Sequence, residues 1–334
     1  MPRRYQPPFQ ISTAALNLVA QISELLGRWS VSADAALAPQ LRRDNRIRTI
    51  QASLAIENNS LSLEQVTAVL DGKRVLGQPR EIQEVRNAFV AYEHMADWQP
   101  GSRNDLLSAH GLLMAGLMDA PGRIRRGDVG IYRGDKLVHM APPASRVGTL
   151  VDQLFGWLDR TDTHPLIASC VFHYEFEFIH PFADGNGRMG RLWQTLMLGR
   201  WQPMLAYLPV ETVIRSQQQD YYAALAASDK ASDATPFVEF MLRALHAAMT
   251  EAVLTGAPVP VSGKMSGKVS GKVSGKVSGK ILAAVRSNPD ITIPELAKLA
   301  GVSSRTIERN LQKLQEQGLL RRVGPAKGGH WELG

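Results

Sequence analysis

Apolar side chains recur every three or four residues along most of the chain up to about residue 250, a spacing that predicts amphipathic helices. Prolines and short polar stretches separate these segments and mark where helices end. The pattern therefore predicts a mainly α-helical fold. Its helices are expected over residues 11–26, 41–56, 80–95, 104–117, 147–158 and 166–179.

One segment departs from this spacing. Residues 129–140, VGIYRGDKLVHM, alternate apolar and polar side chains on either side of Gly134 and Asp135. Alternation around a glycine-containing turn is typical of a β-hairpin. A hairpin is therefore expected between two helices.

A tetrapeptide repeat interrupts the chain near its end. Residues 261–280 read VSGKMSGKVSGKVSGKVSGK, and each unit holds a glycine, which costs about 1 kcal/mol in a helix interior. We interpret residues 256–280 as a linker. Beyond it, short helices are expected over 280–286, 293–300 and 304–317, followed by a two-stranded wing in LLRRVGPAKGGHWEL.

Length and composition limit the class of protein. The chain has 334 residues, 44% hydrophobic and 21% charged, which is typical of a folded protein with two or three domains. No apolar run approaches the roughly 18 residues needed to span a membrane, and the first residues lack the apolar core of a signal peptide. The single cysteine, Cys170, excludes an internal disulfide. These features predict a cytoplasmic protein.

The formal net charge of +7 belongs to the end of the chain. Residues 1–260 carry 25 Lys and Arg against 26 Asp and Glu, whereas residues 261–334 carry 13 against 5. The basic excess therefore does not support nucleic-acid binding by the whole protein, and allows it only for the C-terminal part.

Residues 180–191, HPFADGNGRMGR, gather more reactive side chains than any other stretch. His180 follows a predicted apolar helix and would project from its end into a loop. Gly185 and Gly187 remove two side chains there, so backbone N–H groups and the N-terminus of the next helix can face an anion.

The same loop carries charged side chains suited to phosphates. Asp184 offers the oxygen ligand that Mg²⁺ takes beside phosphates. Arg188 and Arg191 lie three residues apart, so both can project from the first helical turn toward a polyphosphate. A base, an anion-binding backbone, a metal ligand and two guanidinium groups predict a phosphoryl- or nucleotidyl-transfer site.

Residues 180–191 fill every fixed position of the signature H-x-F-x-D/E-G-N-G-R-x-x-R, and by this motif the chain resembles the Fic (filamentation induced by cAMP) family. The likeness extends over about residues 40–250. It implies a helical Fic core with a β-hairpin flap. It also implies transfer of AMP from Mg·ATP to a Ser, Thr or Tyr hydroxyl of a target protein, or of the enzyme itself, with release of pyrophosphate.

The resemblance implies a role for each residue of the motif. His180 would be the general base and Asp184 the ligand of Mg²⁺. The Asn186 side chain would contact the α-phosphate, and Arg188 and Arg191 would hold the outer phosphates. The full set of expected ATP-binding residues is Gly185, Asn186, Gly187, Arg188, Met189, Gly190, Arg191 and Tyr222.

The resemblance extends to residues outside the motif. Val138, His139 and Met140 would belong to a flap that binds a target segment by strand addition. Tyr222 would lie beside the adenine, and Asp229 stands where relatives often carry asparagine.

A second resemblance lies upstream. Residues 53–59, SLAIENN, match the S/T-x-x-x-E-G/N pattern of the inhibitory helix of Fic proteins. Glu57 would pair with Arg191 and displace the γ-phosphate from it. We therefore predict an autoinhibited enzyme with an inhibitory helix at about residues 40–59. The expected domains are an N-terminal helical region (1–110), the catalytic core (111–255), the linker and a C-terminal domain (281–334).

The C-terminal domain resembles a winged helix-turn-helix. Gly301 would form the turn and Ser303 would cap the second helix, which enters the DNA major groove in such domains. Ser304, Arg305 and Arg309 would then contact DNA. The alternative is a protein-contact module.

Other functions stay open from the residues alone. The chain could be a DNA-binding regulator whose Fic domain only senses nucleotide. It could also be a Fic enzyme that transfers UMP, phosphate or phosphocholine, or one that removes AMP using Glu57. His173, Glu177 and His180 share one helical face with a spacing that zinc could use, although packing is the simpler role for His173. The resemblance also allows a homodimer, and no association with a membrane is expected.

Overall fold

The computed structural model describes residues 5–31, 39–133 and 136–255, and in the last part of the chain residues 284–285, 288, 291–300, 307, 310–311, 314–315, 320–323 and 330–333. The linker predicted at 256–280 and the predicted DNA contacts Ser304, Arg305 and Arg309 lie outside the described residues. The chain divides into two compact units, residues 1–260 and 261–334.

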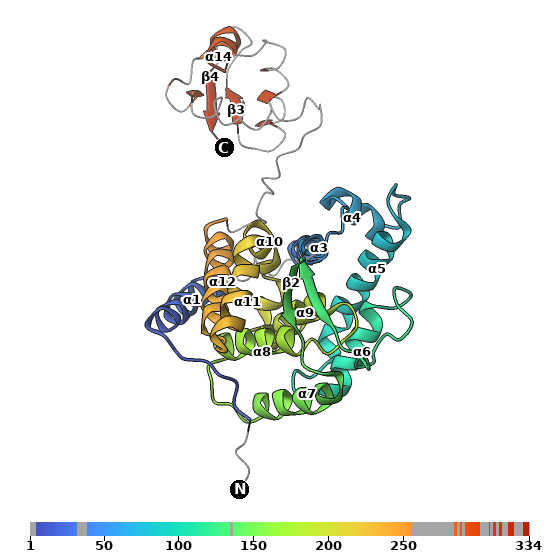
Figure 1. Ribbon diagram of the computed structural model, residues 1–334. Helices are drawn as coiled ribbons and strands as arrows, with labels where there is room; N and C mark the ends of the chain where they lie inside the picture. The colour runs from blue at the N-terminus through green and yellow to red at the C-terminus, as the bar shows by residue number, and fades with distance from the viewer. Residues whose placement is uncertain are drawn as a thin grey trace. The chain divides into compact units, whose positions relative to one another are not determined.

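The first unit is built almost entirely from helices (Figure 1). Its elements in chain order are α1 (Thr13–Val31), α3 (Pro39–Ile56), α4 (Leu63–Leu70), α5 (Pro79–Glu93), η1 (His94–Asp97), α6 (Arg103–Leu113), β1 (Gly130–Arg133), β2 (Lys136–Met140), α7 (Ala144–Leu158), α8 (Pro165–Ile179), α9 (Asn186–Trp201), η2 (Pro203–Tyr207), α10 (Val210–Ser216), α11 (Gln218–Ala231) and α12 (Thr235–Thr255).

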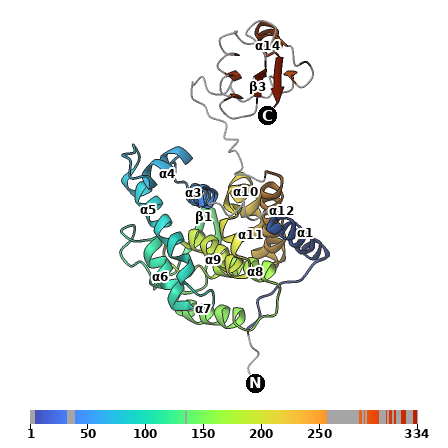
Figure 2. The ribbon, with the colours of Figure 1, turned by 180° about the vertical axis from the view of Figure 1, so that it is seen from behind.

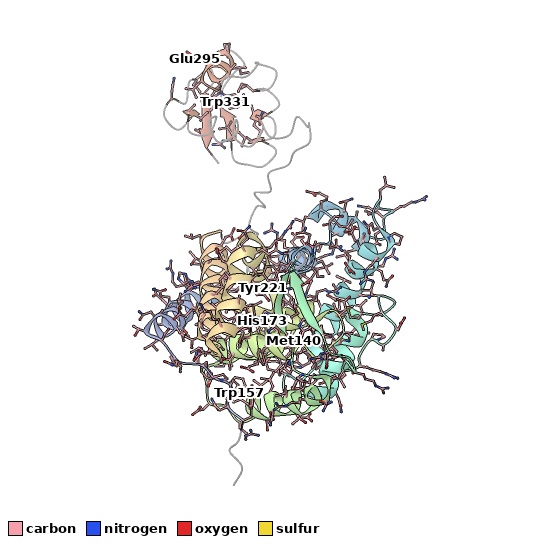
Figure 3. All side chains as sticks on the ribbon, in the orientation of Figure 1. Met140, Trp157, His173, Tyr221, Glu295 and Trp331 are labelled. Carbon is pink, nitrogen blue, oxygen red and sulfur yellow. The ribbon has the colours of Figure 1, made fainter. Side chains whose placement is uncertain are left out.

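Helices α8 and α9 lie side by side in the middle of this bundle, as Figures 1 and 2 show from opposite sides. Both are buried on nearly every face, because their sequences carry apolar residues all round rather than in one stripe. Pro165 stands at the first position of α8, where its missing N–H is not needed. The labelled side chains of His173 and Tyr221 lie inside the bundle (Figure 3), with 3.3 Å between the Tyr221 hydroxyl and His173 Nε2. The motif of residues 180–191 begins directly after α8 and includes the first residues of α9.

The predicted hairpin is confirmed. Strand β1 pairs antiparallel with β2, with Gly130 opposite Met140 and Arg133 opposite Lys136. The register shifts between Ile131 and Tyr132, as in a β-bulge.

Two helix boundaries show how local chemistry sets the ends. The helix expected over 104–117 ends at Leu113, because the chain turns there and Gly116 takes a φ of 70°. Helix α4 is short but well capped: the Ser62 hydroxyl accepts from the Gln65 N–H, and the Gln65 side chain accepts in return from the Ser62 N–H.

The second unit contains α14 (Ile293–Ala300) and a two-stranded antiparallel sheet of β3 (Leu320–Val323) and β4 (His330–Leu333). Helix α14 coincides with the helix expected over 293–300, and the strands lie where the wing was expected. Leu296 and Trp331 are buried in a small core of this unit. Within the part of the chain that the structure describes, no helix is both long and apolar enough to cross a membrane.

Candidate active site

Helix α8 ends where the motif of residues 180–191 begins. His180 takes a left-handed φ of 49°, and its N–H donates to Phe176 O at 2.9 Å, which closes the last turn. The loop then runs to Gly185, whose φ is 83° and where a Cβ would lie 2.7 Å from Met114 Sδ. Glycine is therefore required at this position both by backbone conformation and by space.

The His180 ring has one nitrogen committed to the backbone. Its Nδ1 lies 3.3 Å from Glu177 O. Because a carbonyl oxygen can only accept, Nδ1 carries the hydrogen and Nε2 keeps a lone pair. Burial lowers the pKa of His180 to about 4, and the nearby positive charges of His139 and Arg125 act in the same direction. The ring is therefore held neutral, in the form that accepts a proton.

Arg125 holds the backbone of His180 in place, a role that sequence reasoning missed. This buried side chain donates from Nε to His180 O at 2.7 Å and from Nη2 to Ile179 O at 3.3 Å. It also donates from Nη1 to Gly127 O at 2.8 Å. The basic stretch GRIRRGD contains several arginines of similar sequence context, so no sequence signal singled out this one.

The Asn186 side chain is hydrogen-bonded to the loop backbone and does not line the cavity. Its Oδ1 accepts from Phe182 N at 2.9 Å and its Nδ2 donates to Phe182 O at 2.8 Å, and the residue is buried. We expected this amide on the α-phosphate, whereas the structure bonds both of its ends to the Phe182 backbone. What the first turn of α9 offers to an anion is its backbone N–H groups.

Arg191 is the centre of a set of contacts between α9 and the end of α3. Its Nη2 donates to Glu57 Oε1 at 2.7 Å and to Ser53 O at 3.0 Å, and its Nε donates to Ser53 Oγ at 3.0 Å. The guanidinium group is buried, yet the Glu57 carboxylate raises the pKa of Arg191 against the effect of burial. Both residues of the upstream pattern, Ser53 and Glu57, thus bind the same side chain.

Glu57 also covers the start of α9. A Cβ on Gly187 would collide with Glu57 Oε1, so the carboxylate rests directly on that glycine. The Glu57 side chain is 37% exposed, which leaves it partly open to solvent. A carboxylate is therefore held where the helix N-terminus would otherwise face an anion.

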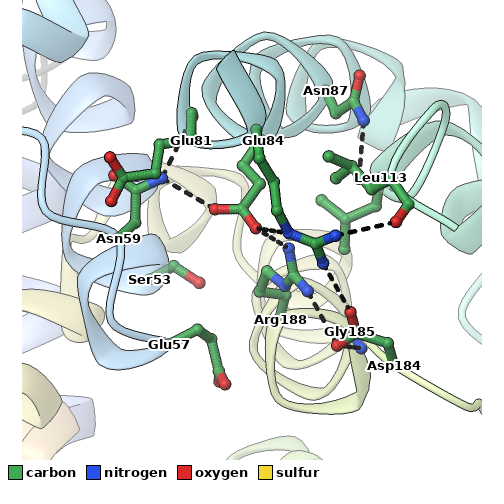
Figure 4. Close-up of polar contacts among 12 residues, drawn as sticks. Ser53, Glu57, Asn59, Glu81, Glu84, Asn87, Leu113, Asp184, Gly185 and Arg188 are labelled. Atoms are coloured by element: carbon green, nitrogen blue, oxygen red, sulfur yellow. Dashed lines mark hydrogen bonds and ion pairs between the residues drawn. The ribbon is translucent and has the colours of Figure 1, made fainter. Parts of the chain in front are cut away.

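Arg188 belongs to a second group of charges (Figure 4). Its Nη2 lies 3.2 Å from Asp184 Oδ1 and its Nη1 lies 3.4 Å from Glu84 Oε1. Arg80 joins both carboxylates, at 3.2 Å from Asp184 Oδ2 and 3.6 Å from Glu84 Oε1. Sequence reasoning missed Arg80 and Glu84, since they lie on α5, about a hundred residues upstream of the motif.

Asp184 fits an ion brought by a substrate better than a resident metal. Among the residues that the structure describes, no group of three His, Cys, Asp or Glu side chains is arranged to hold a metal ion. The Asp184 side chain is 47% exposed. One accessible carboxylate suits Mg²⁺ that completes its coordination with phosphate oxygens and water.

One cavity of about 530 Å³ is lined by His180, Gly187, Arg191 and Glu57. Its volume is within the usual range of small-molecule sites. Tyr222 lines the same cavity, and its hydroxyl lies 3.4 Å from Ile56 O.

His139 turns inward from the hairpin to this cavity. Its Nδ1 lies 2.9 Å from Asp229 Oδ2 and its Nε2 lies 3.0 Å from Phe178 O. Both ring nitrogens face acceptors, and these bonds raise the pKa of His139 against the effect of burial. Met140, in contrast, is 59% exposed, while the Val138 side chain lies outside the described residues. Of the predicted flap residues, Met140 is therefore the one described with an exposed side chain.

Two further residues of the expected ATP-binding set, Met189 and Gly190, do not line the cavity. Met189 is fully buried in the core. A Cβ on Gly190 would lie 2.9 Å from Glu177 Oε1 and from His173 Cδ2, so this glycine packs against α8. Neither has a side chain that could contact a nucleotide in this cavity.

The remaining reactive side chains of α8 have structural surroundings. His173 is buried and its Nδ1 lies 2.7 Å from Gln194 Oε1, which agrees with a packing role. Burial raises the pKa of the Cys170 thiol to about 12, so this thiol stays protonated and unreactive. Burial raises the pKa of Glu177 to about 7, with Arg191 acting in the opposite direction.

Comparison with known proteins gives two family matches. Residues 100–198 match the model described as "Fic/DOC family", and residues 276–321 match "Winged helix-turn-helix DNA-binding". A crystal structure of a Fic family protein from Desulfovibrio desulfuricans is 54% identical and covers 99% of this chain and 98% of its own, with a TM-score of 0.74.

Curated relatives are more distant. "Protein adenylyltransferase Fic" of Culex quinquefasciatus is 28% identical over 229 residues, which is 64% of this chain and 43% of that protein. "Protein adenylyltransferase fic-1" of Caenorhabditis briggsae is 29% identical over 245 residues, which is 68% of this chain and 44% of that protein. The chain thus spans less than half the length of the curated relatives it matches.

Proposed function

The chain belongs to the Fic family, and from that premise we propose that it is a protein adenylyltransferase that moves AMP from ATP to a hydroxyl group of a protein. The observation that carries the proposal is the cavity in which a neutral His180, the N-terminus of α9 and Arg191 come together. Two curated relatives named protein adenylyltransferase support it.

The reaction balances with these groups alone. The target hydroxyl oxygen bonds to the α-phosphorus, the bond between that phosphorus and the α,β-bridging oxygen breaks, and pyrophosphate leaves. His180 Nε2 takes the hydroxyl proton, while Nδ1 stays bonded to Glu177 O. The first N–H groups of α9 face the phosphates, and Arg191 offers a guanidinium group to the γ-phosphate once Glu57 has left it.

Asp184 would hold Mg²⁺ as the ion arrives with ATP. When bound, the ion neutralises phosphate charge and favours departure of pyrophosphate. Arg188 and Arg80 both contact the Asp184 carboxylate, so with Asp184 on the ion Arg188 would keep its contact with Glu84 and would have Nη2 for the phosphates.

We further propose that the form seen here is inhibited. Glu57 occupies the guanidinium group of Arg191 and rests on Gly187, so ATP cannot bring its γ-phosphate to either. The same ion pair joins α3 to α9, which makes release of Glu57 a movement of the end of α3.

Intact mass spectrometry tests the proposed reaction. The full-length chain, with Glu57 replaced by glycine, is incubated with ATP, UTP or CDP-choline in the presence of Mg²⁺. We expect addition of AMP mass with ATP and none with the other two. Addition of phosphate, UMP or phosphocholine would assign a different cargo, and an unchanged mass with ATP would contradict the proposed reaction.

The dependence of transfer on pH reports the state of His180. Since the buried ring has a pKa of about 4, it is neutral throughout the usual assay range and is protonated only as the pH falls through that value. Glu177 lines the same cavity and its pKa is raised to about 7, so the profile is measured in a chain with Glu177→Gln, which keeps the backbone carbonyl that holds Nδ1. In that chain we expect the rate at low ATP concentration to be level from pH 8 down to about 5 and to decline below that. An acid limb centred near 6.5, the ordinary value of histidine, would contradict this assignment.

Replacement of Asp184 by asparagine tests the proposed ion contact. The change keeps the size of the side chain and removes the charge that Mg²⁺ requires. Because even supporting residues of metal sites alter affinity by about tenfold or more, we expect at least a tenfold higher Mg²⁺ concentration for half-maximal transfer. Asp128→Asn, which alters a carboxylate near the hairpin, serves as the matched control. An unchanged Mg²⁺ requirement in Asp184→Asn would reject the contact.

We also propose that the C-terminal unit binds DNA, on the strength of its family match and of the basic excess after residue 260. A mobility-shift titration of the full chain should show binding that weakens as salt rises. Binding that is absent at low salt would favour a protein-contact role for this unit.

A further inference from the structure

A second cavity, of about 730 Å³, lies among α3, the junction of α5 with η1, the C-terminal half of α9 and η2. None of the residues lining it lines the catalytic cavity. Its volume is within the range of pockets that bind small molecules. The function proposed above makes no use of it.

Positive charge is concentrated on its walls. Arg42, Arg43, Arg46 and Arg200 line the cavity, and Glu93 is the acidic residue among its lining residues. Arg43 is neutralised by Asp71 at 2.7 Å. Arg200 donates to two backbone carbonyl oxygens, of Ala96 and Trp98. The wall therefore carries more positive charge than its own carboxylate can balance.

Among the described residues, Arg42 and Arg46 contact aromatic rings and no carboxylate pairs with them. Their guanidinium carbons lie 5.5 Å and 5.1 Å from the centre of the Tyr207 ring, and Arg46 lies 4.9 Å from the centre of the Tyr92 ring. Arg46 is 8% exposed, and its hydrogen bond to Ala206 O is long, at 3.4 Å. Arg42 Nε is buried and has no hydrogen-bond partner among the described residues.

Such an arrangement is unusual for a purely structural feature. Buried cations in folded proteins are generally paired with an anion, and buried N–H groups are generally bonded. Contact with the Tyr207 ring leaves guanidinium N–H groups from which an oxyanion could accept, among them the unbonded Nε–H of Arg42. An anion between Arg42 and Arg46 would balance their charge and accept from their N–H groups.

The rest of the cavity is apolar. Phe89, Met95, Leu196, Met204 and Pro203 contribute to its walls. A free phosphate ion would satisfy the arginines and leave this apolar surface uncovered. A ligand with an apolar body as well as an anionic group would cover both.

We propose that this arginine–tyrosine cavity, lined by Arg42, Arg46 and Tyr207, binds a small amphipathic anion. Its phosphate, sulfonate or carboxylate group lies against Arg42 and Arg46, and its apolar body lies against Met95 and Met204. Because residues of α3 and α9 line the cavity, the ligand contacts the helix that Glu57 directly follows and the helix that carries Arg191.

The test uses 1-naphthalenesulfonate as probe, since it joins one anionic group to an apolar bicyclic body and has no resemblance to a nucleotide. Calorimetric titration into the full-length chain should show saturable binding at one site. Arg42→Gln should weaken it by about tenfold or more, as expected for loss of a charged hydrogen-bond donor. Arg86→Gln, an exposed arginine of α5 outside the cavity, is the matched control and should leave affinity unchanged.

A second variant keeps all charges. Ala96→Phe places a ring at an exposed position of the cavity wall and should also weaken binding, which keeps the test decisive if Arg42→Gln does not fold. Tyr222→Ala, in the catalytic cavity, should bind the probe as the unmodified chain does. The proposal is overturned if the unmodified chain does not bind the probe, if Arg42→Gln and Ala96→Phe bind it normally, or if Tyr222→Ala loses binding.

Discussion

Replacement of His180 by alanine is expected to lower AMP transfer by at least about a hundredfold, and up to about ten-thousandfold, because the variant has no group to take the hydroxyl proton. The contribution is large since His180 lines the cavity, and its neutral ring keeps a lone pair on Nε2 while Nδ1 is bonded to Glu177 O. The rate is measured as label from the α-phosphate of ATP bound to protein, in a chain that also carries Glu57→Gly so that the starting activity is high.

Two controls separate a chemical role from a structural one. His94→Ala removes an exposed histidine, bonded to Asp97, and should leave transfer unchanged. Calorimetry should show that His180→Ala still binds ATP with nearly the affinity of its parent, since the base contacts the hydroxyl rather than the phosphates. Transfer that persists in His180→Ala would remove the proposed base.

Replacement of Glu57 by glycine is expected to raise transfer by about tenfold to a hundredfold. A hydrogen bond between charged groups is worth about 1.5–3 kcal/mol, and every 1.4 kcal/mol is a factor of ten. The variant frees Arg191 and uncovers Gly187, so the γ-phosphate has both a guanidinium group and space. Initial rates of AMP incorporation at fixed Mg·ATP measure the change.

The neighbouring residue supplies a matched control. Asn58 has a positive φ of 68°, which glycine adopts without strain, so Asn58→Gly loosens the same turn and keeps the carboxylate. It should not raise transfer. Glu57→Gln, which keeps the shape of the side chain and removes its charge, should raise transfer by a smaller factor than glycine does. An equal rise in Asn58→Gly would mean that loop flexibility, not the ion pair, limits the reaction.

Local signals in the sequence predicted the main parts of the site. The apolar segment before His180 gave a helix that agrees with α8 within one residue at its start and ends at the same position. The resemblance of residues 53–59 to an inhibitory helix led us to expect the Glu57–Arg191 pair, and the structure contains it, with Ser53 as a further partner of Arg191 that was not predicted. Gly185 was expected because a side chain there would keep the backbone N–H groups from an anion. Its φ of 83° is a conformation that favours glycine.

What the sequence could not predict depends on contacts between distant segments. Glu84 on α5 contacts Arg188 on α9 only in the folded chain, and neither segment's sequence indicates the other as its partner. The Asn186 amide could bond either to a phosphate or to the Phe182 backbone. The folded loop brings the Phe182 N–H and C=O within reach of the amide, and the sequence does not show this. The arginine–tyrosine cavity also depends on contacts between distant segments. Nothing in the sequence indicates that Arg46 would lie 5.1 Å from the centre of the Tyr207 ring.

The measurement that tests the central claim most directly compares two labels in ATP. The purified Glu57→Gly chain is incubated with Mg²⁺ and with ATP labelled on either the α-phosphate or the γ-phosphate, and the label bound to the chain is counted. The proposed reaction predicts bound label from the α-phosphate and none from the γ-phosphate. The double variant Glu57→Gly, His180→Ala should bind label from neither. Label from the γ-phosphate, or α-label that persists without His180, would contradict it.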